Sequence, residues 1–434
     1  MPLPRLAIVG SGIAGLGCAY FLRSRYALSL YEQNDYIGGH TNTIDVTYRG
    51  ESASFDTGFM VYNPVTYPNL WRFFAELQVP AQPTLMSFSV QHCPTGLEYC
   101  GSGLSGLFAQ RRNLLRPRHW RMLQAMARFN REAVQTLRDE SNLDLTVAEY
   151  VEQRGYGPDF LDLFLLPMSS AVWSTPRDEM LRFPAHTLLR FFYNHGFLGL
   201  KGRHPWWTVT GGAREYVRRL EPHLGNRFRL RKRVVQVTKV REGVEVQTED
   251  GAVESYDRVI LACHGDQALG LLSSPHPLAQ TLLQEFRYQP NLATVHTDAS
   301  VMPRRRRIWS SWNYRISADK NGKMTSQTTY WMNSLQGVSE RNPYFVSINA
   351  GDSVDRRTVL REISYEHPLF SLGAIRAQRE LPRLNQLGHE TGIFFAGSYF
   401  KYGFHEDAFT SALNCCRELT GADIWPGSAS KTES

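Results

Sequence analysis

The start of the chain alternates between short apolar runs and a glycine-rich turn. Residues 5–9 and 28–31 are dominated by apolar side chains, and between them lie the glycines of 10–15 and an apolar segment that begins near Ile13. Short apolar runs bounded by turn residues are typical of strands buried in a parallel sheet, whereas a longer apolar segment after glycines favours a helix. The pattern predicts a strand, a tight turn, a helix and a second strand that ends at Glu32.

Further strand patterns lie in the middle of the chain and near its end. Residues 233–237 and 244–247 alternate between apolar and polar side chains, and the Asp-Gly pair at 250–251 is a strong hairpin turn. Residues 257–262 and 392–397 are again short apolar runs. We therefore predict an α/β protein in which a Rossmann-like parallel sheet carries a β-hairpin insert.

The length of 434 residues favours about two domains, and no linker rich in Pro, Gly or Ser separates them. We therefore expect interleaved domains, because domains joined end to end usually have such a linker. The domain of the parallel sheet is expected from residues 1–59, 206–264 and 384–426. A discontinuous α+β domain for the substrate is expected from residues 60–205 and 265–383. Residues 427–434 are polar and short of apolar side chains, which predicts a disordered tail.

The glycine turn has the spacing of a dinucleotide-binding fingerprint within its strand and helix context. Gly10 permits the tight turn, Gly12 lets the backbone approach a pyrophosphate, and Gly15 lets the helix pack closely on the strand. The positive end of the helix then points at the phosphates, and Glu32 can accept hydrogen bonds from ribose hydroxyls. The cofactor contacts expected here are Gly10, Gly12, Ile13, Ala14, Gly15 and Glu32.

The residues after Glu32 extend this fingerprint through Gly38-Gly39-His40. The run resembles the extended FAD signature of the flavin-containing amine oxidase superfamily, which also includes protoporphyrinogen oxidases and carotenoid desaturases. Members of that family usually have arginine after the glycine pair, and histidine lacks its guanidinium fork and permanent charge. The resemblance implies FAD as the cofactor. We expect non-covalent binding, because no cysteine or histidine occupies an obvious linkage motif.

A second match lies near the end of the chain, where Ala396 and Gly397 follow a strand and Glu406 opens a helix. The sequence departs from the family at Ser398, where an acid is usual, and at Asp407, where a glycine is usual. The resemblance also implies that one valine backbone meets the adenine and that a returning segment approaches the flavin ring. The further FAD contacts implied are Gly38, Gly39, His40, Gly58, Phe59, Val234, Gly397, Ser398, Glu406, Asp407 and Ala408.

Catalytic residues are harder to assign, because no Ser/His/Asp or paired-carboxylate arrangement stands out. The loop before the last helix passes under the flavin in the family, so Tyr402 and His405 are the catalytic candidates. For His405, the interpretation that the sequence favours is a residue that hydrogen-bonds within the loop. Amine-oxidising relatives commonly place a lysine near the flavin, and we assign no such lysine here, which counts modestly against amine substrates.

A closer resemblance covers most of the chain through the runs at 96–99, 107–115 and 404–408. They are similar to bacterial NAD/FAD-binding oxidoreductases associated with cyclopropane fatty-acyl synthases, which implies acyl chains or other lipids as substrates. The leading hypothesis is FAD-dependent dehydrogenation or desaturation of a lipophilic substrate, with hydride passing to the flavin. An amine oxidase that releases hydrogen peroxide and a redox-silent FAD-dependent isomerase or mutase are the alternatives.

Residues 101–106 also spell the glycine fingerprint, but residues 95–100 are of mixed character and predict no strand before it. We therefore expect no NAD(P)H domain, and the flavin should be reduced by the substrate itself. Oxygen, a quinone or a protein carrier would then accept the electrons, and the sequence does not choose among them.

Composition fits a globular protein, with 42% hydrophobic residues and 12% aromatic residues. The six cysteines form no Cys-x-x-Cys pair and no zinc spacing, so neither a metal site nor a disulfide is expected. No apolar run reaches about 18 residues, and the start of the chain lacks a secretory signal pattern. We expect a cytoplasmic protein.

The net charge of +7 is unevenly placed, and one basic stretch also holds many large apolar side chains. Residues 107–129 interleave arginines with leucine, phenylalanine and tryptophan, which favours a partly amphipathic helix. Such a helix could pack on the substrate domain or lie on an anionic membrane surface, in which case the protein would be peripheral at the inner membrane face. No nucleic-acid-binding module accompanies these charges, so we expect no nucleic-acid partner.

Overall fold

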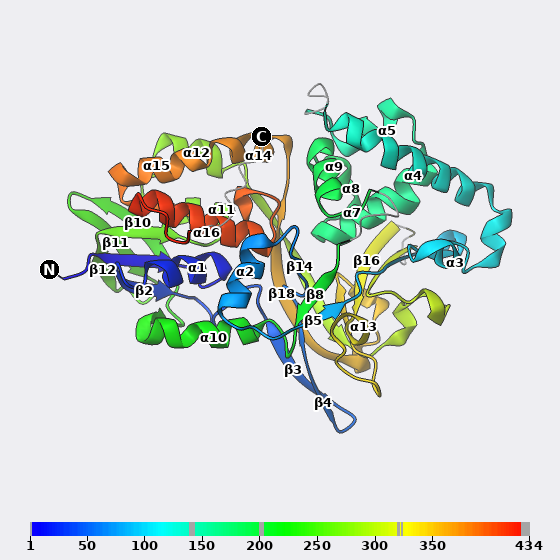
Figure 1. Cartoon of the computed structure of the whole chain (residues 1–434), viewed down its shortest axis with the longest axis horizontal. Coiled ribbons are helices and arrows are strands. Elements are labelled where there is room, and N and C mark those ends of the chain that lie inside the picture. The colour runs from blue at the N-terminus through cyan, green and yellow to red at the C-terminus, as the bar shows by residue number, and fades with distance from the viewer. Residues whose placement is uncertain (1, 139–143, 199–203, 319–321, 323, 427–434) are drawn as a thin grey trace.

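Figure 1 shows the computed structural model of the chain. It describes residues 2–138, 144–198, 204–318, 322 and 324–426. The tail 427–434, for which we predict disorder, lies outside the described residues. One half of the molecule is built around a five-stranded parallel sheet. Its strands, in pairing order, are β19 (Ile393–Phe395), β13 (Arg258–Leu261), β1 (Arg5–Val9), β2 (Ala27–Tyr31) and β9 (Phe228–Arg229).

The central strand β1 is covered on both faces, which explains its continuous apolar run. Leu6 and Ile8 share one hydrophobic cluster with two helices, whereas Ala7 and Val9 share another with a small antiparallel sheet. Successive side chains of a strand point to opposite faces, so a strand covered on both sides must be apolar throughout. The covering elements are α1 (Ile13–Leu22), α16 (His405–Thr420), β10 (Val234–Val240), β11 (Gly243–Thr248) and β12 (Val253–Tyr256).

This arrangement confirms the predicted α/β fold, a Rossmann-like parallel sheet with an antiparallel insert. The insert has three strands, because β11 pairs with β10 on one side and with β12 on the other. The predicted Asp-Gly turn at 250–251 joins β11 to β12, and the Gly251 N–H donates to the Thr248 carbonyl at 2.9 Å.

The other half contains a seven-stranded mixed sheet and a layer of helices (Figure 1). The strands, in pairing order, are β18 (Val359–Leu369), β14 (Arg287–His296), β17 (Phe345–Ile348), β16 (Met324–Trp331), β15 (Trp312–Ala318), β6 (Phe88–His92) and β7 (Leu97–Cys100). The helices are α3 (Gly103–Leu107), α4 (Pro117–Thr136), α5 (Val147–Arg154), α6 (Pro158–Phe160), α7 (Leu166–Trp173), α8 (Arg177–Leu181) and α9 (Ala185–Asn194). Val90 of β6 and Tyr99 of β7 belong to the same hydrophobic cluster as these helices.

The remaining elements join the two halves or flank them. They are β3 (Thr43–Tyr48), β4 (Glu51–Asp56), β5 (Ala81–Thr84), β8 (Trp206–Val209), α2 (Pro68–Glu76), α10 (Arg214–Leu224), α11 (Gly265–Leu271), α12 (Pro277–Leu283), α13 (Met332–Gln336), α14 (Leu372–Glu380) and α15 (Pro382–Thr391). The parallel sheet thus takes its strands from three separated stretches of chain, and the mixed sheet takes its strands from the stretches between them.

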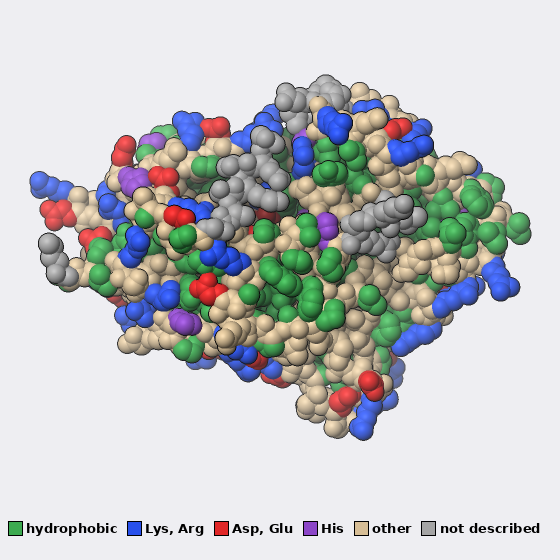
Figure 2. Space-filling model, in the orientation of Figure 1, with side chains coloured by type: hydrophobic (Ala, Val, Ile, Leu, Met, Phe, Trp, Pro, Cys, Tyr) green, Lys and Arg blue, Asp and Glu red, His purple; other side chains and the backbone are tan. Residues whose placement is uncertain are grey.

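Two expectations for the region around residue 100 are wrong. Residues 97–100 do form a strand, β7, whose four side chains are all buried, Leu97 and Tyr99 in the hydrophobic cluster of the helical layer. This strand is an antiparallel edge strand, and the helix after it has only five residues, so the geometry differs from a nucleotide-binding turn. The basic stretch 107–129 is helical only from Pro117 onward, because residues 111–115 form a 3₁₀ turn. Figure 2 shows large apolar side chains at this end of the molecule.

The six cysteines, all within the described ranges, are free. Cys18 of α1 and Cys415 and Cys416 of α16 are fully buried where these two helices pack together. Among the helices that the structure describes, none has the length and apolar character needed to cross a bilayer.

Candidate cofactor and active site

The candidate site begins at the carboxyl end of β1, where the chain turns into α1. Gly10 has a φ of +104°, and a Cβ there would lie 2.7 Å from the Ala262 carbonyl oxygen. A Cβ on Gly15 would lie 1.9 Å from the Gly10 oxygen. Strand, turn and helix therefore pack too closely for side chains at these two glycines, as the fingerprint predicts.

Gly12 is glycine for a different reason. Its φ of −66° suits any residue, and no described atom lies within 4 Å of the position that a Cβ would take. The open space faces the N-terminus of α1, where Ile13 and Ala14 begin the helix. A helix N-terminus offers unpaired N–H groups and a positive dipole end, which suit a pyrophosphate. This space fits the phosphate part of a dinucleotide.

Glu32 lies at the end of β2 with its carboxylate buried and held by four hydrogen bonds. Oε2 accepts from the Ser11 N–H at 3.1 Å and the Ser11 hydroxyl at 2.6 Å, and Oε1 accepts from the Asn34 N–H and side-chain amide, both at 2.9 Å. A carboxylate has about four lone-pair positions. A ribose hydroxyl would therefore replace one of the side-chain donors, Ser11 or Asn34, which sequence reasoning missed.

Val234 is held close to Glu32 by a backbone hydrogen bond between the neighbouring segments. The Lys232 N–H donates to the Glu32 carbonyl at 2.9 Å, and β10 begins two residues later with the buried side chain of Val234. The segment that we predict to meet an adenine is thus next to the residue that we predict to meet its ribose.

The second glycine pair packs directly on the first. The Gly38 N–H donates to the Ser11 carbonyl at 3.0 Å, and a Cβ on Gly39 would lie 3.2 Å from the Cα of Gly12. Both glycines have positive φ, +119° and +60°. The structure therefore brings together two glycine segments that are separated along the chain.

His40 follows this pair and makes close contact with the returning segment. Its carbonyl accepts from the Phe59 N–H at 2.9 Å, and a Cβ on Gly58 would lie 2.2 Å from the same oxygen. Its ring stacks on Tyr365 with centroids 5.0 Å apart and lies 5.5 Å from the His367 ring. The predicted positions 40, 58 and 59 therefore meet, together with side chains of β18.

Three further histidines surround His40 or lie close to it. The His264 ring is 6.2 Å from the His40 ring and stacks on Tyr288 at 4.2 Å. Burial lowers the pKa of His40 and His264 to about 4 and that of His367 and His405 to about 3. The imidazoles are therefore neutral at pH 7. Within the described ranges, no three His, Cys, Asp or Glu side chains are arranged to hold a metal ion.

The two catalytic candidates face different parts of the molecule. The His405 ring stacks on Phe59 with centroids 3.9 Å apart, and its Nε2 lies 2.9 Å from the Thr41 hydroxyl. Tyr402 instead faces the helical layer, where its carbonyl accepts from the Trp173 indole at 3.1 Å and its ring lies 5.8 Å from Phe191. The His405 ring thus lies against Phe59, a predicted cofactor contact, whereas the Tyr402 ring lies against the helical layer.

Tyr402 borders a cluster of aromatic side chains from separate segments of the chain. Phe191 stacks on His195 at 3.8 Å and on Phe404 at 5.0 Å, and Trp173 lies 4.6 Å from Phe191. These residues come from α7, from α9 and the residue that follows it, and from the loop before α16. We name Trp173, Phe191, His195 and Phe404 the aromatic cluster. Burial lowers the pKa of His195 to about 4, so this ring is also neutral.

The start of α16 is fixed by its own acids. The Glu406 carboxylate accepts from the N–H groups of Asn69 and Leu70, at 3.0 and 2.9 Å, and the Asp407 carboxylate accepts from the Phe404 N–H at 2.9 Å. Burial raises the pKa of Glu406 to about 8 and that of Asp407 to about 6, whereas the N–H donors lower both. Both side chains therefore already bind backbone N–H groups of the protein itself.

Two other predicted contacts and the next turn complete this end of the site. The Gly397 N–H donates to the Ser411 hydroxyl at 2.8 Å, and a Cβ on Gly397 would lie 2.4 Å from the Tyr399 ring. The Ser398 carbonyl accepts from the Gly403 N–H at 3.2 Å, and Ala408 is buried. These residues follow β19, whose carboxyl end lies at the same edge of the sheet as the glycine turn because the strands are parallel.

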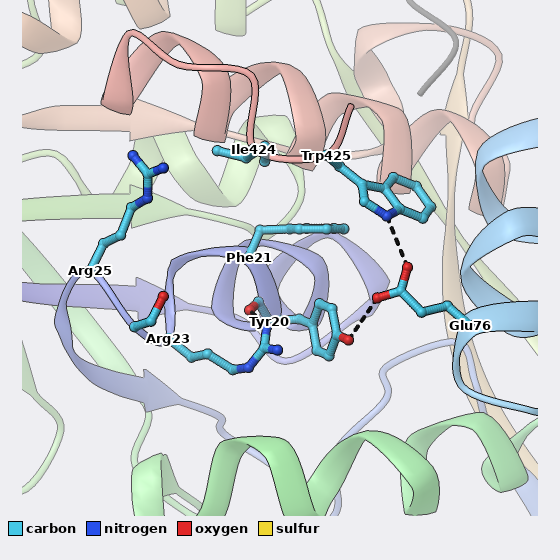
Figure 3. Close-up of a pocket in the computed structure, with 8 residues that line it drawn as sticks. Tyr20, Phe21, Arg23, Arg25, Glu76, Ile424 and Trp425 are labelled. Carbon is cyan, nitrogen blue, oxygen red and sulfur yellow. Dashed lines mark hydrogen bonds between the residues drawn. The ribbon is translucent and has the colours of Figure 1, made fainter. Parts of the chain in front are cut away.

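A surface pocket of about 310 Å³ lies at the other end of α1 (Figure 3). Glu76 bridges it, accepting from the Tyr20 hydroxyl at 2.8 Å and from the Trp425 indole at 2.9 Å. The pocket is lined by Tyr20, Phe21, Arg23, Ser24, Arg25, Glu76, Ile424 and Trp425. The Glu76 carboxylate joins α2 to Trp425, near the end of the described chain. The pocket lies away from the glycine turn.

Comparison with known proteins agrees with this geometry. The family model for flavin containing amine oxidoreductases matches residues 13–356, which include the second glycine pair and residues 58–59. No curated protein matches the chain. The structure supplies what the family match lacks, because residues 396–408 lie beyond the matched span.

Similar folds occur among solved structures. Putrescine oxidase bound to putrescine aligns with a TM-score of 0.68 and 14% identity over 97% of this chain and 99% of its own. CLA-producing fatty acid isomerase from P. acnes aligns with a TM-score of 0.66 and 14% identity, covering 94% and 97%. Reduced UDP-galactopyranose mutase aligns with a TM-score of 0.64 and 14% identity, covering 96% of each chain. At these identities the likeness shows the fold.

A Rossmann-like sheet, its open glycine turn and a facing mixed sheet define a flavin-dependent oxidoreductase. The family match covers well over half of the chain. The chain belongs to the flavin-containing amine oxidoreductase family.

Proposed function

We propose that this enzyme binds FAD non-covalently and dehydrogenates or desaturates a lipophilic substrate, with a fatty-acyl chain as the leading candidate. The flavin supplies the redox chemistry by accepting the hydride that leaves a substrate C–H bond. The protein binds and orients both molecules and excludes water. The N-terminus of α1 would hold the phosphates, Glu32 and Val234 the adenosine end, and the segment from His40 to Phe59 the ring end.

The proposal of a lipophilic substrate rests on the aromatic cluster beside the loop before α16. Its rings are apolar or, at His195, neutral at pH 7. The ammonium group of Lys401 lies 5.3 Å from the centroid of the Tyr402 ring at the border of this cluster. A nearby cation repels an amine substrate, which is itself a cation, and attracts a carboxylate. An acyl chain with a terminal carboxylate suits both features.

His405 is the better placed of the two catalytic candidates. Its ring lies on Phe59, and the low pKa keeps it neutral, so its Nε2 can exchange a hydrogen bond with Thr41 without adding charge. It would therefore position the ring end of the cofactor or accept a proton there. Tyr402 would instead contact the substrate from the side of the aromatic cluster.

The purified protein should be yellow, and acid precipitation should release FAD into the supernatant. Anaerobic mixing with long-chain fatty acids should bleach the flavin band. Lys401→Met should raise the KM for the fatty acid about tenfold, as expected for the loss of one partly buried charge contact, and leave the flavin spectrum unchanged. Lys239→Met, at an exposed position of β10, is the matched control. A colourless, folded protein that ignores added FAD would overturn the proposal.

Two alternatives have their own support and their own readout. The name of the family favours an amine oxidase, which would bleach with amines and release hydrogen peroxide on reoxidation. The fold likeness to a fatty acid isomerase favours a redox-silent use of FAD, which would convert a fatty acid without bleaching. Reoxidation of the bleached enzyme by oxygen, a quinone or a protein carrier would then identify the electron acceptor.

A further inference from the structure

Four large apolar side chains are exposed together at one end of the molecule. Leu115 is 87% exposed, Leu104 is 73%, Leu114 is 51% and Trp120 is 43%. We name these four residues the apolar tip. They lie in α3, the 3₁₀ turn Arg111–Leu115 and the first turn of α4, at the end of the longest axis (Figures 1 and 2). Single exposed leucines are ordinary on a protein surface, whereas a group of this kind marks an interaction site.

The local structure holds these side chains outward. Asn113 is fully buried in the middle of the 3₁₀ turn, where its side-chain amide donates to the Glu98 carbonyl at 3.2 Å. Because Asn113 points inward, the next two residues, Leu114 and Leu115, are presented to solvent. The Trp120 indole donates to the Leu114 carbonyl at 2.8 Å, which fixes the turn to α4. The apolar tip is thus a defined feature of the fold.

The same region is strongly basic. Between Glu98 and Glu132 the chain has seven arginines and no carboxylate side chain. Two of them, Arg118 and Arg121, pair with Asp159 at 2.5 and 2.7 Å. Three other arginines flank the apolar tip, namely Arg111, Arg112 and Arg116. Within the described part of the chain, no carboxylate partner is found for them.

A second basic segment lies against the tip from a distant part of the sequence. Ile308 is buried in a small cluster with Cys100 and Ala109, which places residues 304–307, all arginines, beside α3 and the 3₁₀ turn. Arg305 pairs with Glu98 at 3.2 Å, while Arg304 and Arg307 are exposed. Two separate segments therefore supply positive charge to one surface.

We propose that the apolar tip inserts into the surface of an anionic phospholipid bilayer, with the flanking arginines on the lipid phosphates. Leucine and tryptophan side chains enter the region between headgroups and acyl chains, and arginine stems can lie along it with their charges at the phosphates. A nucleic acid or an acidic protein would match the charge, but neither requires exposed leucines. The proposal is independent of the substrate, although a bilayer surface would supply lipophilic molecules.

Co-sedimentation of the full-length, FAD-loaded protein with vesicles tests this surface. The protein should sediment with vesicles of equal parts phosphatidylglycerol and phosphatidylcholine, and less so with pure phosphatidylcholine or at high salt. The double variant Leu114→Gln/Leu115→Gln should lose most of this binding without a change of charge. Val253→Gln, at a 53% exposed position of β12 at the other end of the molecule, should bind like the wild type.

The charge contribution is tested in the same assay. Arg111→Gln/Arg307→Gln should reduce binding severalfold and weaken its dependence on salt, whereas Arg241→Gln, in the exposed β10–β11 turn, should not. Flavin absorbance must be normal in every variant, which separates this proposal from the proposed function. Wild-type protein that stays in the supernatant overturns the proposal, as does undiminished binding by the leucine variant. Preferential binding to duplex DNA, equal in wild type and leucine variant, would assign the surface to nucleic acid and overturn it as well.

Discussion

At the scale of single residues, the three fingerprint positions are glycine for three different reasons. Gly10 adopts a positive φ, Gly15 lies too close to the Gly10 carbonyl for any Cβ, and Gly12 faces open space. The first two are needed by the protein itself. Only Gly12 has no structural reason to be glycine, so it reports on the ligand.

Gly12→Val should therefore leave the fold intact and abolish cofactor binding, because the branched side chain would occupy the pyrophosphate space. We expect FAD affinity to fall by about 100-fold or more, a loss of about 3 kcal/mol, measured by calorimetric titration of the apoprotein. Its melting temperature without FAD should match that of the wild type. Gly270→Val, at another glycine with no atom within 4 Å, is the control and should bind FAD normally. Tight FAD binding by Gly12→Val would contradict the assignment.

Glu32 allows a second test at this scale. Because Ser11 and Asn34 occupy all four of its lone-pair positions, ribose binding must displace a side-chain donor. Ser11→Ala should therefore leave FAD affinity unchanged or tighten it slightly. Glu32→Gln should weaken it by about 10- to 100-fold, the value of one hydrogen bond to a charged group. Weakened binding by Ser11→Ala together with unchanged binding by Glu32→Gln would show that Ser11, not Glu32, contacts the cofactor.

At the scale of elements, Glu406 joins two helices that sequence analysis treats separately. Its carboxylate lies at the start of α16 and accepts the first free N–H groups of α2. The family resemblance led us to expect a cofactor contact at this position, and the structure shows a joint between helices. The joint holds α2 against the segment that carries Phe59, since Phe74 of α2 lies 6.3 Å from the Phe59 ring.

Glu406→Ala should destabilise the protein by about 2 to 4 kcal/mol, since the two buried backbone N–H groups that donate to the Glu406 carboxyl oxygens would lose their partners. Chemical denaturation would measure the loss, and amide exchange should quicken at Asn69 and Leu70 more than in α1. Glu418→Ala, at a partly exposed acid near the other end of α16, should cost less than about 0.5 kcal/mol. Unchanged exchange at Asn69 and Leu70 would show that α2 is held by its apolar contacts alone.

The elements also show how far sequence alone could lead. The glycine turn and Glu32 were predictable, because their spacing along about 25 residues is set by the strand, turn and helix that connect them. Tyr365 and His367 were not, since they occupy ordinary alternating positions of β18, and only the pairing of distant strands brings them to His40. The aromatic cluster was not predictable either, because aromatic residues in helices usually indicate a hydrophobic core.

At the scale of the whole molecule, the junction between the two halves is lined by neutral histidines. His40 and His405 belong to the glycine-rich segments and the start of α16, whereas His367 belongs to the mixed sheet. Each has a pKa lowered by burial, and the pKa of His367 is lowered further by His40. Protonating one imidazole would therefore oppose protonation of its neighbours and load charge onto the junction.

The sign of the resulting pH dependence follows from linkage. Histidine has a pKa near 6.5 in the unfolded chain and about 3 at His367 in the folded protein, so between these values the unfolded state binds more protons. Stability from His367 is present above pH 6.5 and is lost as the pH falls below it, by at most about 1.4 kcal/mol per pH unit. Asp56, Asp407 and Glu406 act in the opposite direction, because burial raises the pKa of the two aspartates to about 6 and that of Glu406 to about 8.

His367→Gln separates these contributions, because glutamine can keep a hydrogen bond with Asn291 but cannot be protonated. Because glutamine packs imperfectly at this position, the variant should be less stable than the wild type near pH 7.5. Near pH 5 its stability should approach or exceed that of the wild type. Melting temperatures across this range, with His389→Gln at an exposed position as the control, would measure the crossing. Parallel curves for wild type and His367→Gln would mean that the junction does not resist protonation, and that acid stability is set elsewhere in the fold.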